Sequence, residues 1–283
     1  MSVTVPTSLD EALGALRDDP EAQVLAGGTD LMVEVNFGHR RPASVVALHR
    51  VTALRGIDHD AAAGRIRIGA GTTWTDLLAE PIVSAAPALA EAARTVGSPQ
   101  IRNAGTIGGN LGTCSPAGDG LPVLSALDAE VELRSSAGVR TMSIHEFMVG
   151  VKRTARRPGE LITAVTVPVL DGPQGYAKVG VRNAMVISAA GACLALDRRG
   201  RSVRLALGAV GPTILRAREA EDWLAATLDW DDRSASLGGG VAEEFGRRAA
   251  AAARPIDDHR ATAEYRRHAV GVLATRLLRR AFP

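Results

Sequence analysis

The sequence is poor in cysteine and in aromatic residues, and it has no excess of either charge. Its 283 residues include 2 Cys, 4 Phe, 3 Trp and 2 Tyr, and its formal net charge is +2. Two distant cysteines, Cys114 and Cys193, argue against a disulfide framework. An iron–sulfur cluster normally needs four thiolates, so this chain cannot hold one alone. The balanced charge and the few aromatics predict no nucleic-acid partner.

Long apolar runs are also missing. The longest, residues 183–196, is too short to span a bilayer, and the first eleven residues lack the basic start and apolar core of a signal peptide. Hydrophobic residues make up 46% of the chain and charged residues 23%, as in a packed globular protein. We therefore predict a soluble cytoplasmic protein without membrane insertion.

Most familiar catalytic motifs are absent. The six histidines show no HxxxH or HxH pairing, so no metal site is predicted, and neither a GxxxxGK[ST] loop nor a GxSxG elbow occurs. Residues 69–74 begin like a GxGxxG fingerprint but end on Trp74, whose bulk would block close helix–strand packing. With no visible acid, base or nucleophile, any chemistry would belong to a bound cofactor.

Periodicity predicts a mixed chain in three parts. Ser8 and Glu11 form a capping box at the start of a helix. Further elements follow from alternation and helical spacing: strands at 23–26, 45–48, 65–70 and 161–167, a hairpin of 130–133 with 139–142, helices at 73–78 and 88–96, three strands at 176–181, 187–196 and 203–209, and a final helix at 259–280. With Asp171–Pro173 as a linker, we predict domains at 1–55, 56–171 and 172–283, the last of α+β type.

Residues 97–120 stand apart, being rich in Gly, Ser, Thr, Asn and Pro and without helical periodicity. A long stretch of this kind inside a compact domain is usually functional. Cys114 lies within it, but no adjacent His or basic cluster would activate its thiol, so we interpret it as a small buried filler.

Two paired-glycine segments are the strongest candidates for a binding site. They are Ala26-Gly27-Gly28-Thr29-Asp30 and Thr106-Ile107-Gly108-Gly109-Asn110. Glycine lets backbone N–H groups approach an anion closely, and Thr and Asn beside it can donate to phosphate oxygens. Two such segments suit a diphosphate held between them. The alternative is that each pair is only a tight turn.

Two acidic residues next to these segments have two interpretations. The carboxylate of Asp119 could accept hydrogen bonds from ribose hydroxyls, or it could cap the segment that begins at Leu121. Asp30 has the same two interpretations.

At these segments the sequence resembles the FAD-binding medium subunit of the molybdenum hydroxylases, the family of xanthine dehydrogenase and carbon monoxide dehydrogenase. The resemblance covers nearly the whole chain, and its matching segments are Val24–Leu31, Gly97–Leu111, Pro116–Asp119, Ala126–Val131, Glu160–Ile162, and Lys178 with Arg182. The chain departs from the family at Met185-Val186-Ile187, where many relatives have an acidic residue.

The resemblance implies a vanillyl-alcohol-oxidase-like (PCMH-type) FAD-binding fold of two α/β subdomains, followed by a C-terminal domain with a three-stranded antiparallel sheet and helices. It places the FAD pyrophosphate at Leu25, Ala26, Gly27, Gly28, Thr29, Asp30 and Leu31 and at Thr106, Ile107, Gly108, Gly109 and Asn110. It places the adenosine ribose at Asp119, and the flavin ring near Ile162 and Lys178.

The same resemblance implies an electron-transfer role. Molybdopterin and [2Fe–2S] clusters are expected on a large and a small partner subunit, in a heterotrimer or a dimer of heterotrimers. Substrate is then oxidised at molybdenum, and FAD in this chain passes the electrons to an external acceptor. Two alternatives remain: a stand-alone FAD oxidoreductase acting on a small molecule, and a module that binds FAD or another diphosphate without turnover.

Overall fold

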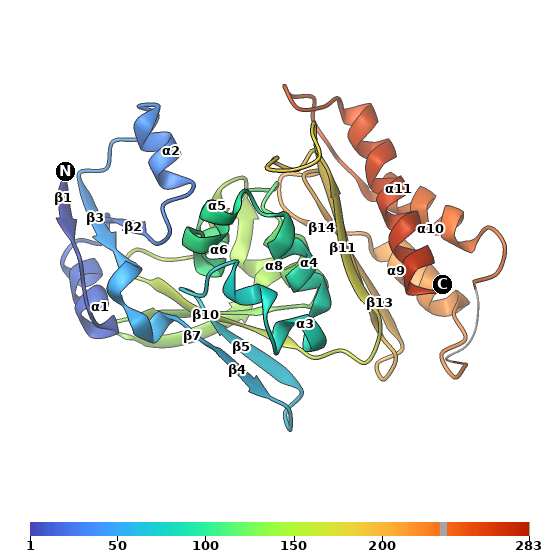
Figure 1. Cartoon of the computed structure of the whole chain (residues 1–283), viewed down its shortest axis with the longest axis horizontal. Coiled ribbons are helices and arrows are strands. Elements are labelled where there is room, and N and C mark those ends of the chain that lie inside the picture. Colours follow the sequence, from blue (N-terminus) through green and yellow to red (C-terminus); the bar gives the residue numbers. More distant parts are fainter. Residues whose placement is uncertain (233–236, 283) are drawn as a thin grey trace.

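The computed structural model describes residues 1–232 and 237–282, which form three larger sheets side by side and one small two-stranded sheet (Figure 1). The first sheet is parallel, with strand order β1-β3-β2, and belongs to a unit that also contains two short helices. In chain order its elements are β1 (Ser2–Thr4), α1 (Leu9–Asp18), β2 (Gln23–Leu25), α2 (Leu31–Asn36) and β3 (Ser44–Ala47).

Helix α1 begins at the predicted cap. Ser8 Oγ accepts a hydrogen bond from the Glu11 N–H, as expected, but the Glu11 carboxylate reaches back one residue further, to Thr7 N at 2.7 Å. Leu13 and Leu16 on this helix are buried against the sheet. The capping box is therefore confirmed, with Thr7 in place of Ser8 as the reciprocal donor.

The second sheet is antiparallel, with order β4-β5-β10-β6-β7. Its strands are β4 (Ile57–Asp60), β5 (Arg65–Gly69), β6 (Glu130–Ser135), β7 (Gly138–Ser143) and β10 (Leu161–Pro168). The intervening chain forms η3 (Asp76–Leu78), α3 (Ile82–Ala85), α4 (Pro87–Thr95), α5 (Pro99–Ala104), α6 (Ile107–Thr113), α7 (Gly120–Ala126), α8 (Ile144–Phe147), β8 (Met148–Gly150) and β9 (Arg153–Thr154).

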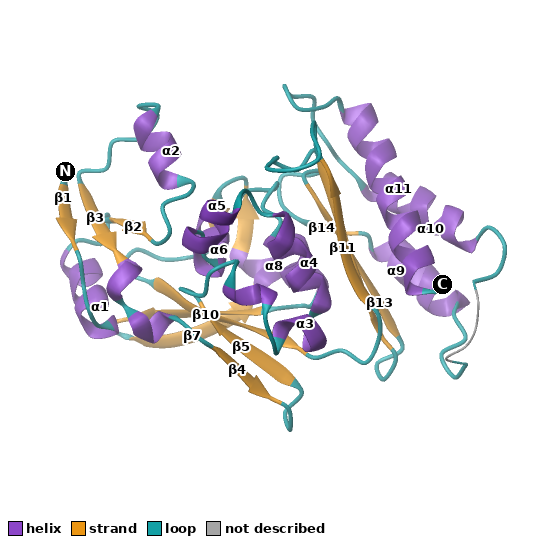
Figure 2. Ribbon diagram, viewed as in Figure 1, coloured by secondary structure: helices purple, strands orange, loops and turns teal. Residues whose placement is uncertain are grey.

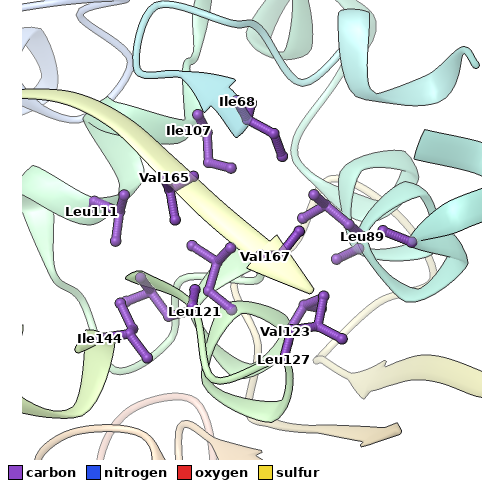
Figure 3. Packing of buried hydrophobic residues seen from close by; sticks show 14 of the residues in the cluster. Ile68, Leu89, Ile107, Leu111, Leu121, Val123, Leu127, Ile144, Val165 and Val167 are labelled. Carbon is purple, nitrogen blue, oxygen red and sulfur yellow. The ribbon is translucent and has the colours of Figure 1, made fainter. Parts of the chain in front are cut away.

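The largest hydrophobic cluster joins this sheet to its helices (Figure 3). Ile68 of β5 and Val165 of β10 pack with Ile107 and Leu111 of α6, all of them fully buried. Burial of a branched side chain of this size stabilises the fold by about 1.5–3 kcal/mol. Helix α6, which contains the second glycine pair, is thereby held firmly on the sheet.

The third sheet is antiparallel and consists of β11 (Gln174–Val179), β12 (Ala190–Asp197), β13 (Ser202–Gly208) and the two-residue β14 (Leu215–Arg216). Helices α9 (Arg218–Thr227), α10 (Val241–Ala252) and α11 (Ala263–Ala281) cover its outer face (Figure 2). Gly246 and Gly271 allow α10 and α11 to approach closely, because a Cβ on Gly246 would lie 2.7 Å from the Gly271 carbonyl oxygen. The expected strand and helix order is confirmed, although the sheet has a fourth strand.

Residues 97–120 contain the helices α5 and α6, although the sequence shows no helical periodicity there. Ser98 caps α5, accepting from Ile101 N, with Pro99 in the first turn, and Thr106 caps α6, accepting from Gly109 N. These helices have six and seven residues, too few for an apolar period to show. The Ser-Pro start of α5 was the available signal.

No helix within the described residues is long and apolar enough to cross a membrane. On the last helix, Val270, Leu273 and Leu277 form a buried stripe.

Candidate functional site

A cavity of about 840 Å³ lies where the first glycine segment meets α6. This is the size of pockets that hold cofactors or drug-sized ligands. Of the predicted site residues, the following line it: Leu25, Ala26, Gly27, Gly28, Thr29, Asp30, Leu31, Thr106, Gly108, Gly109, Asn110, Asp119 and Ile162. Ile107 and Lys178 do not, because Ile107 is fully buried in the core and Lys178 lies behind the wall.

The first segment, between β2 and α2, offers unpaired backbone donors. Within the described parts of the chain, no hydrogen bond is formed by the N–H groups of Gly27, Gly28, Thr29 and Asp30. Gly28 has φ +73°, a left-handed conformation that suits glycine. Gly27 packs on the end of α5, where a Cβ would lie 1.8 Å from the Ala104 carbonyl oxygen. Successive free N–H groups of this kind form an anion-binding concavity.

The second segment differs from the first, because its backbone donors from Ile107 to Asn110 are already paired. Ile107 N donates to Thr72 O, Gly108 N donates to Ala70 O, and Gly109 N donates to Thr106 Oγ1. The glycines belong to the first turn of α6, so the tight-turn alternative is wrong here. This segment contributes shape and side chains to the cavity rather than free backbone amides.

Asn110 supplies an unpaired acceptor in the cavity wall. Its Oδ1 is buried and has no hydrogen-bond partner among the residues that the structure describes. The side chain packs against Gly118 and Gly120, where added Cβ atoms would lie 2.7 Å from Nδ2 and 2.9 Å from Oδ1. A buried polar atom without a partner is rare in folded proteins and indicates a missing ligand or water.

Asp119 accepts three hydrogen bonds from the C-terminal part of the chain (residues 174–282). Tyr176 Oη and Ser188 Oγ donate to Oδ1 at 2.8 and 2.7 Å, and Lys178 Nζ donates to Oδ2 at 2.6 Å. The carboxylate accepts no hydrogen bond from the backbone of α7, the helix that follows. The alternative that Asp119 caps this helix is therefore wrong. Burial, followed by the negative charge of Asp119, raises the pKa of Tyr176 well above its usual value, which keeps this donor protonated.

Lys178 has all three of its ammonium protons engaged. Nζ donates to Asp119 Oδ2, to Thr95 O at 3.0 Å and to Val186 O at 3.1 Å. Met185, Val186 and Ile187 line the cavity, so this lysine fixes a cavity wall from behind. The departure from the family pattern therefore places three apolar residues in that wall.

Charged groups tie α2 to the β8–β9 turn at the edge of the cavity. Lys152 Nζ donates to Glu34 Oε1 at 2.5 Å and lies 3.7 Å from Asp30 Oδ2. The hydrogen bond from Lys152 holds the pKa of Glu34 below its usual value. Asp30 occupies the N-cap position of α2 but makes no capping bond; it accepts from Thr113 Oγ1 at 3.4 Å.

Several lining residues were not predicted, among them His49, Trp74, Ile101, Asn103 and Lys152. They come from four separate segments, and no local motif marks them. Within the described residues, no group of three or more His, Cys, Asp or Glu could hold a metal ion. Cys114 is buried and caps the end of α6, as the filler interpretation predicted.

The residues fit a large diphosphate-containing cofactor. Among the described residues, the cavity offers four unpaired amides, together with the apolar Leu161, Ile162 and Ile187 for a ring system. The fold and the site thus define a protein whose chemistry belongs to a bound dinucleotide.

Comparison with known sequences gives the family. Residues 1–170 match the family described as "FAD binding domain in molybdopterin dehydrogenase", and residues 176–281 match "CO dehydrogenase flavoprotein C-terminal domain". The chain belongs to this family of FAD-binding subunits, which confirms the predicted family and fold.

Individual relatives align over almost the full length. The glyceraldehyde dehydrogenase medium chain of Sulfolobus acidocaldarius is 33% identical, over 94% of this chain and 92% of that protein. The carbon monoxide dehydrogenase medium chain of Hydrogenophaga pseudoflava is 32% identical, over 98% and 95%. Among solved structures, quinoline 2-oxidoreductase from Pseudomonas putida superposes with a TM-score of 0.90 and 26% identity, over 99% of this chain and 96% of that one.

Proposed function

We propose that this chain is the FAD-carrying electron-transfer subunit of a heteromeric molybdenum-containing dehydrogenase. The observation that supports it most is the cavity with four unpaired amides, in a chain whose two halves both match the flavoprotein subunits of this family. FAD accepts and donates two electrons, singly or as a pair, and so links one-electron and two-electron partners.

We assign the diphosphate of FAD to the cavity between the β2–α2 loop and α6. Gly27, Gly28, Thr29 and Asp30 would donate their free N–H groups, between Leu25, Ala26 and Leu31 of the same loop, while Thr106, Gly108, Gly109 and Asn110 shape the opposite wall. Asp119 would accept from the adenosine ribose, and Ile162 would contact the flavin ring. Ile107 and Lys178 would act from behind the wall, without touching the cofactor.

The electrons would come from another chain. The sequence has two cysteines, both buried, whereas a [2Fe–2S] cluster is usually held by four thiolates. Relatives named as medium chains are parts of assemblies. We therefore assign [2Fe–2S] clusters to a small subunit and molybdopterin, with the choice of organic substrate, to a large one.

Spectroscopy on the purified chain tests the proposal. We expect one flavin per chain, which substrate bleaches only after the two partner subunits are added. Bleaching by substrate with this chain alone would favour a stand-alone oxidoreductase. A chain that binds no FAD would contradict the proposal. We further propose that the complex is cytoplasmic, which cell fractionation tests. We also propose that it is a heterotrimer or a dimer of heterotrimers, which the mass of the native complex tests.

A further inference from the structure

Helix α2 and the β8–β9 turn expose apolar side chains at the border of the cavity. Figure 1 shows α2 standing apart from the other labelled helices, and none of its residues is buried. Phe37, directly after the helix, is 74% exposed, and Val151 in the turn is 57% exposed. The full apolar set, which we call the α2 patch, consists of Met32, Val33, Phe37, Val149 and Val151. An exposed group of apolar side chains of this kind marks a site of protein–protein contact.

An ion pair places the two parts of the α2 patch beside one another. Lys152 Nζ, in the turn, donates to Glu34 Oε1 of α2 at 2.5 Å and lies 3.7 Å from Asp30 Oδ2. Lys152 and Glu34 line the cavity, whereas none of the five apolar residues does. The α2 patch therefore lies outside the cofactor cavity but next to its border, where a partner protein can bind without entering the cavity.

The charged residues around the α2 patch are mostly basic. The two segments that carry it, residues 30–41 and 148–153, contain four cations and two carboxylates, so they have a surplus of two positive charges. This surplus is as large as that of the whole chain. Both carboxylates are paired with cations of the same segments. Within the described residues, the exposed Arg41 and Arg153 form no ion pair, so two cations are left for a partner.

We propose that the α2 patch docks the electron-donating [2Fe–2S] subunit, through a partner surface with an apolar centre and acidic side chains around it. This inference rests on the proposed function, because it takes FAD as the ligand of the cavity and a cluster protein as the source of electrons. Free basic side chains favour an acidic surface and speed its approach. Of the two proposed partner subunits, the one that passes electrons to FAD must reach the border of the cavity, which selects the small subunit.

Another exposed apolar segment beside the cavity, residues 181–187, lacks this charge pattern. Val181, Met185 and Ile187 are 69%, 56% and 55% exposed. The one cation of the segment, Arg182, donates to the Met185 carbonyl oxygen at 3.1 Å and is thus engaged within the segment itself. Val181 does not line the cavity, so it offers a matched control for the α2 patch.

Binding of the small subunit to the FAD-loaded chain tests the apolar part of the inference. The probe is the cysteine-rich subunit dissociated from the purified native complex, and biolayer interferometry gives its affinity. We expect Phe37→Ser to weaken binding about tenfold to a hundredfold, and Val33→Ser at least about threefold. Val181→Ser should bind as wild type does. Since none of the three side chains lines the cavity, the affinity for FAD should stay unchanged.

Reversal of charge tests the electrostatic part. The double variant Arg41→Glu/Arg153→Glu should associate with the small subunit about tenfold more slowly at 50 mM salt, but less than about twofold more slowly at 500 mM, because salt screens exposed charges. The control is Arg199→Glu/Arg201→Glu in the β12–β13 turn, where the side chains are 86% and 61% exposed. It changes the net charge equally and should associate as wild type does.

The outcomes separate this inference from the proposed function. Wild-type affinity of Phe37→Ser and Val33→Ser would overturn docking at the α2 patch, and so would a loss seen only in Val181→Ser. A loss of affinity for the large subunit instead of the small one would also overturn it. Wild-type association of Arg41→Glu/Arg153→Glu would overturn the acidic partner surface. All these results leave the proposed function intact, whereas a small subunit that does not bind the FAD-loaded wild-type chain would overturn both.

Discussion

Ala26 and Gly109 adjoin in the wall of the cavity: a Cβ on Gly109 would lie 3.9 Å from the Cβ of Ala26, at van der Waals contact. Both residues line the cavity, and they belong to the two glycine segments, which are about eighty residues apart. The fold thus brings together the two motifs that stand out in the sequence. It also gives them different roles, because the amides of Ile107 to Asn110 are paired, whereas those of Gly27 to Asp30 form no hydrogen bond with the described residues.

Replacing Gly27 of the first segment by alanine should lower the stability of the fold. Gly27→Ala should destabilise the fold by about 1–3 kcal/mol or more, because its Cβ would overlap the Ala104 carbonyl. Urea unfolding measures this. Gly14→Ala in α1 is the control: beyond the adjoining backbone of α1, a Cβ there would meet no described atom within 4 Å, so the change should stabilise the fold by about 0.5–1 kcal/mol. Equal stability of Gly27→Ala and wild type would refute the close packing of the first segment on α5.

Stability should fall in acid partly through Asp128. Burial acts to raise the pKa of Asp128, but the hydrogen bond from His145 and the charges of Arg216 and Arg204 outweigh it and hold the pKa at about 2. Because this pKa is below the ordinary value of 3.8, the stabilisation is present above about pH 4 and is lost as pH falls toward 2.

Asp128→Asn should therefore lower the free energy of unfolding at pH 6 and reduce its loss between pH 5 and pH 3, as measured by urea unfolding at each pH. Asp231→Asn, at an exposed ion pair with Arg201, is the control and should behave as wild type. A pH dependence of Asp128→Asn as steep as that of wild type would contradict the role of this carboxylate.

Neither thiol should react in the native protein. Burial raises the pKa of the Cys114 thiol to about 11 and that of Cys193 still further above its usual value. Since the thiolate is the reactive form, iodoacetamide at pH 7.5 should label no cysteine until the protein is unfolded in urea, when both should react. Mass spectrometry counts the labels. Rapid native labelling of Cys114 would show that the thiol is accessible and would oppose its interpretation as a filler.

Helix α2 should be the most weakly held wall of the cavity. None of its residues is buried, and Lys152 ties it to the β8–β9 turn through Glu34. Such half-exposed ion pairs contribute about 1 kcal/mol at most. Lys152→Met should therefore increase amide exchange in residues 31–36 by up to about fivefold, while α6 stays protected. Unchanged exchange in α2 would show that the ion pair does not hold it.

The sequence predicted most strands and helices because their signals are local. Alternation marks β5, and the Ser8–Glu11 pair marks the start of α1. It missed α5 and α6, whose helical residues are too few to show a period. Both helices begin at side-chain caps, and α6 is also held by burial of Ile107 and Leu111 against strands distant in sequence.

The sequence predicted the motifs of the candidate site but not the hydrogen bonds that join distant residues there. Most of the predicted residues line one cavity. The pairing of Asp119 with Lys178, and the presence of Tyr176 and Ser188 beside them, depend on how the third sheet packs against α7 and α4, which no local pattern encodes. The sequence also could not predict that the amides of Ile107 and Gly108 are hydrogen-bonded, because their acceptors, Thr72 and Ala70, precede them by more than thirty residues.

The central claim is that the cavity lined by the two glycine segments holds the diphosphate of FAD. Titration of the apoprotein with FAD, followed by flavin fluorescence, tests it in Gly109→Val, with Gly14→Val as the matched control and circular dichroism to verify folding. We predict that folded Gly109→Val binds FAD at least about tenfold more weakly, since its side chain would occupy the space between the two segments, while Gly14→Val binds as wild type does. Folded Gly109→Val with wild-type affinity would contradict the claim.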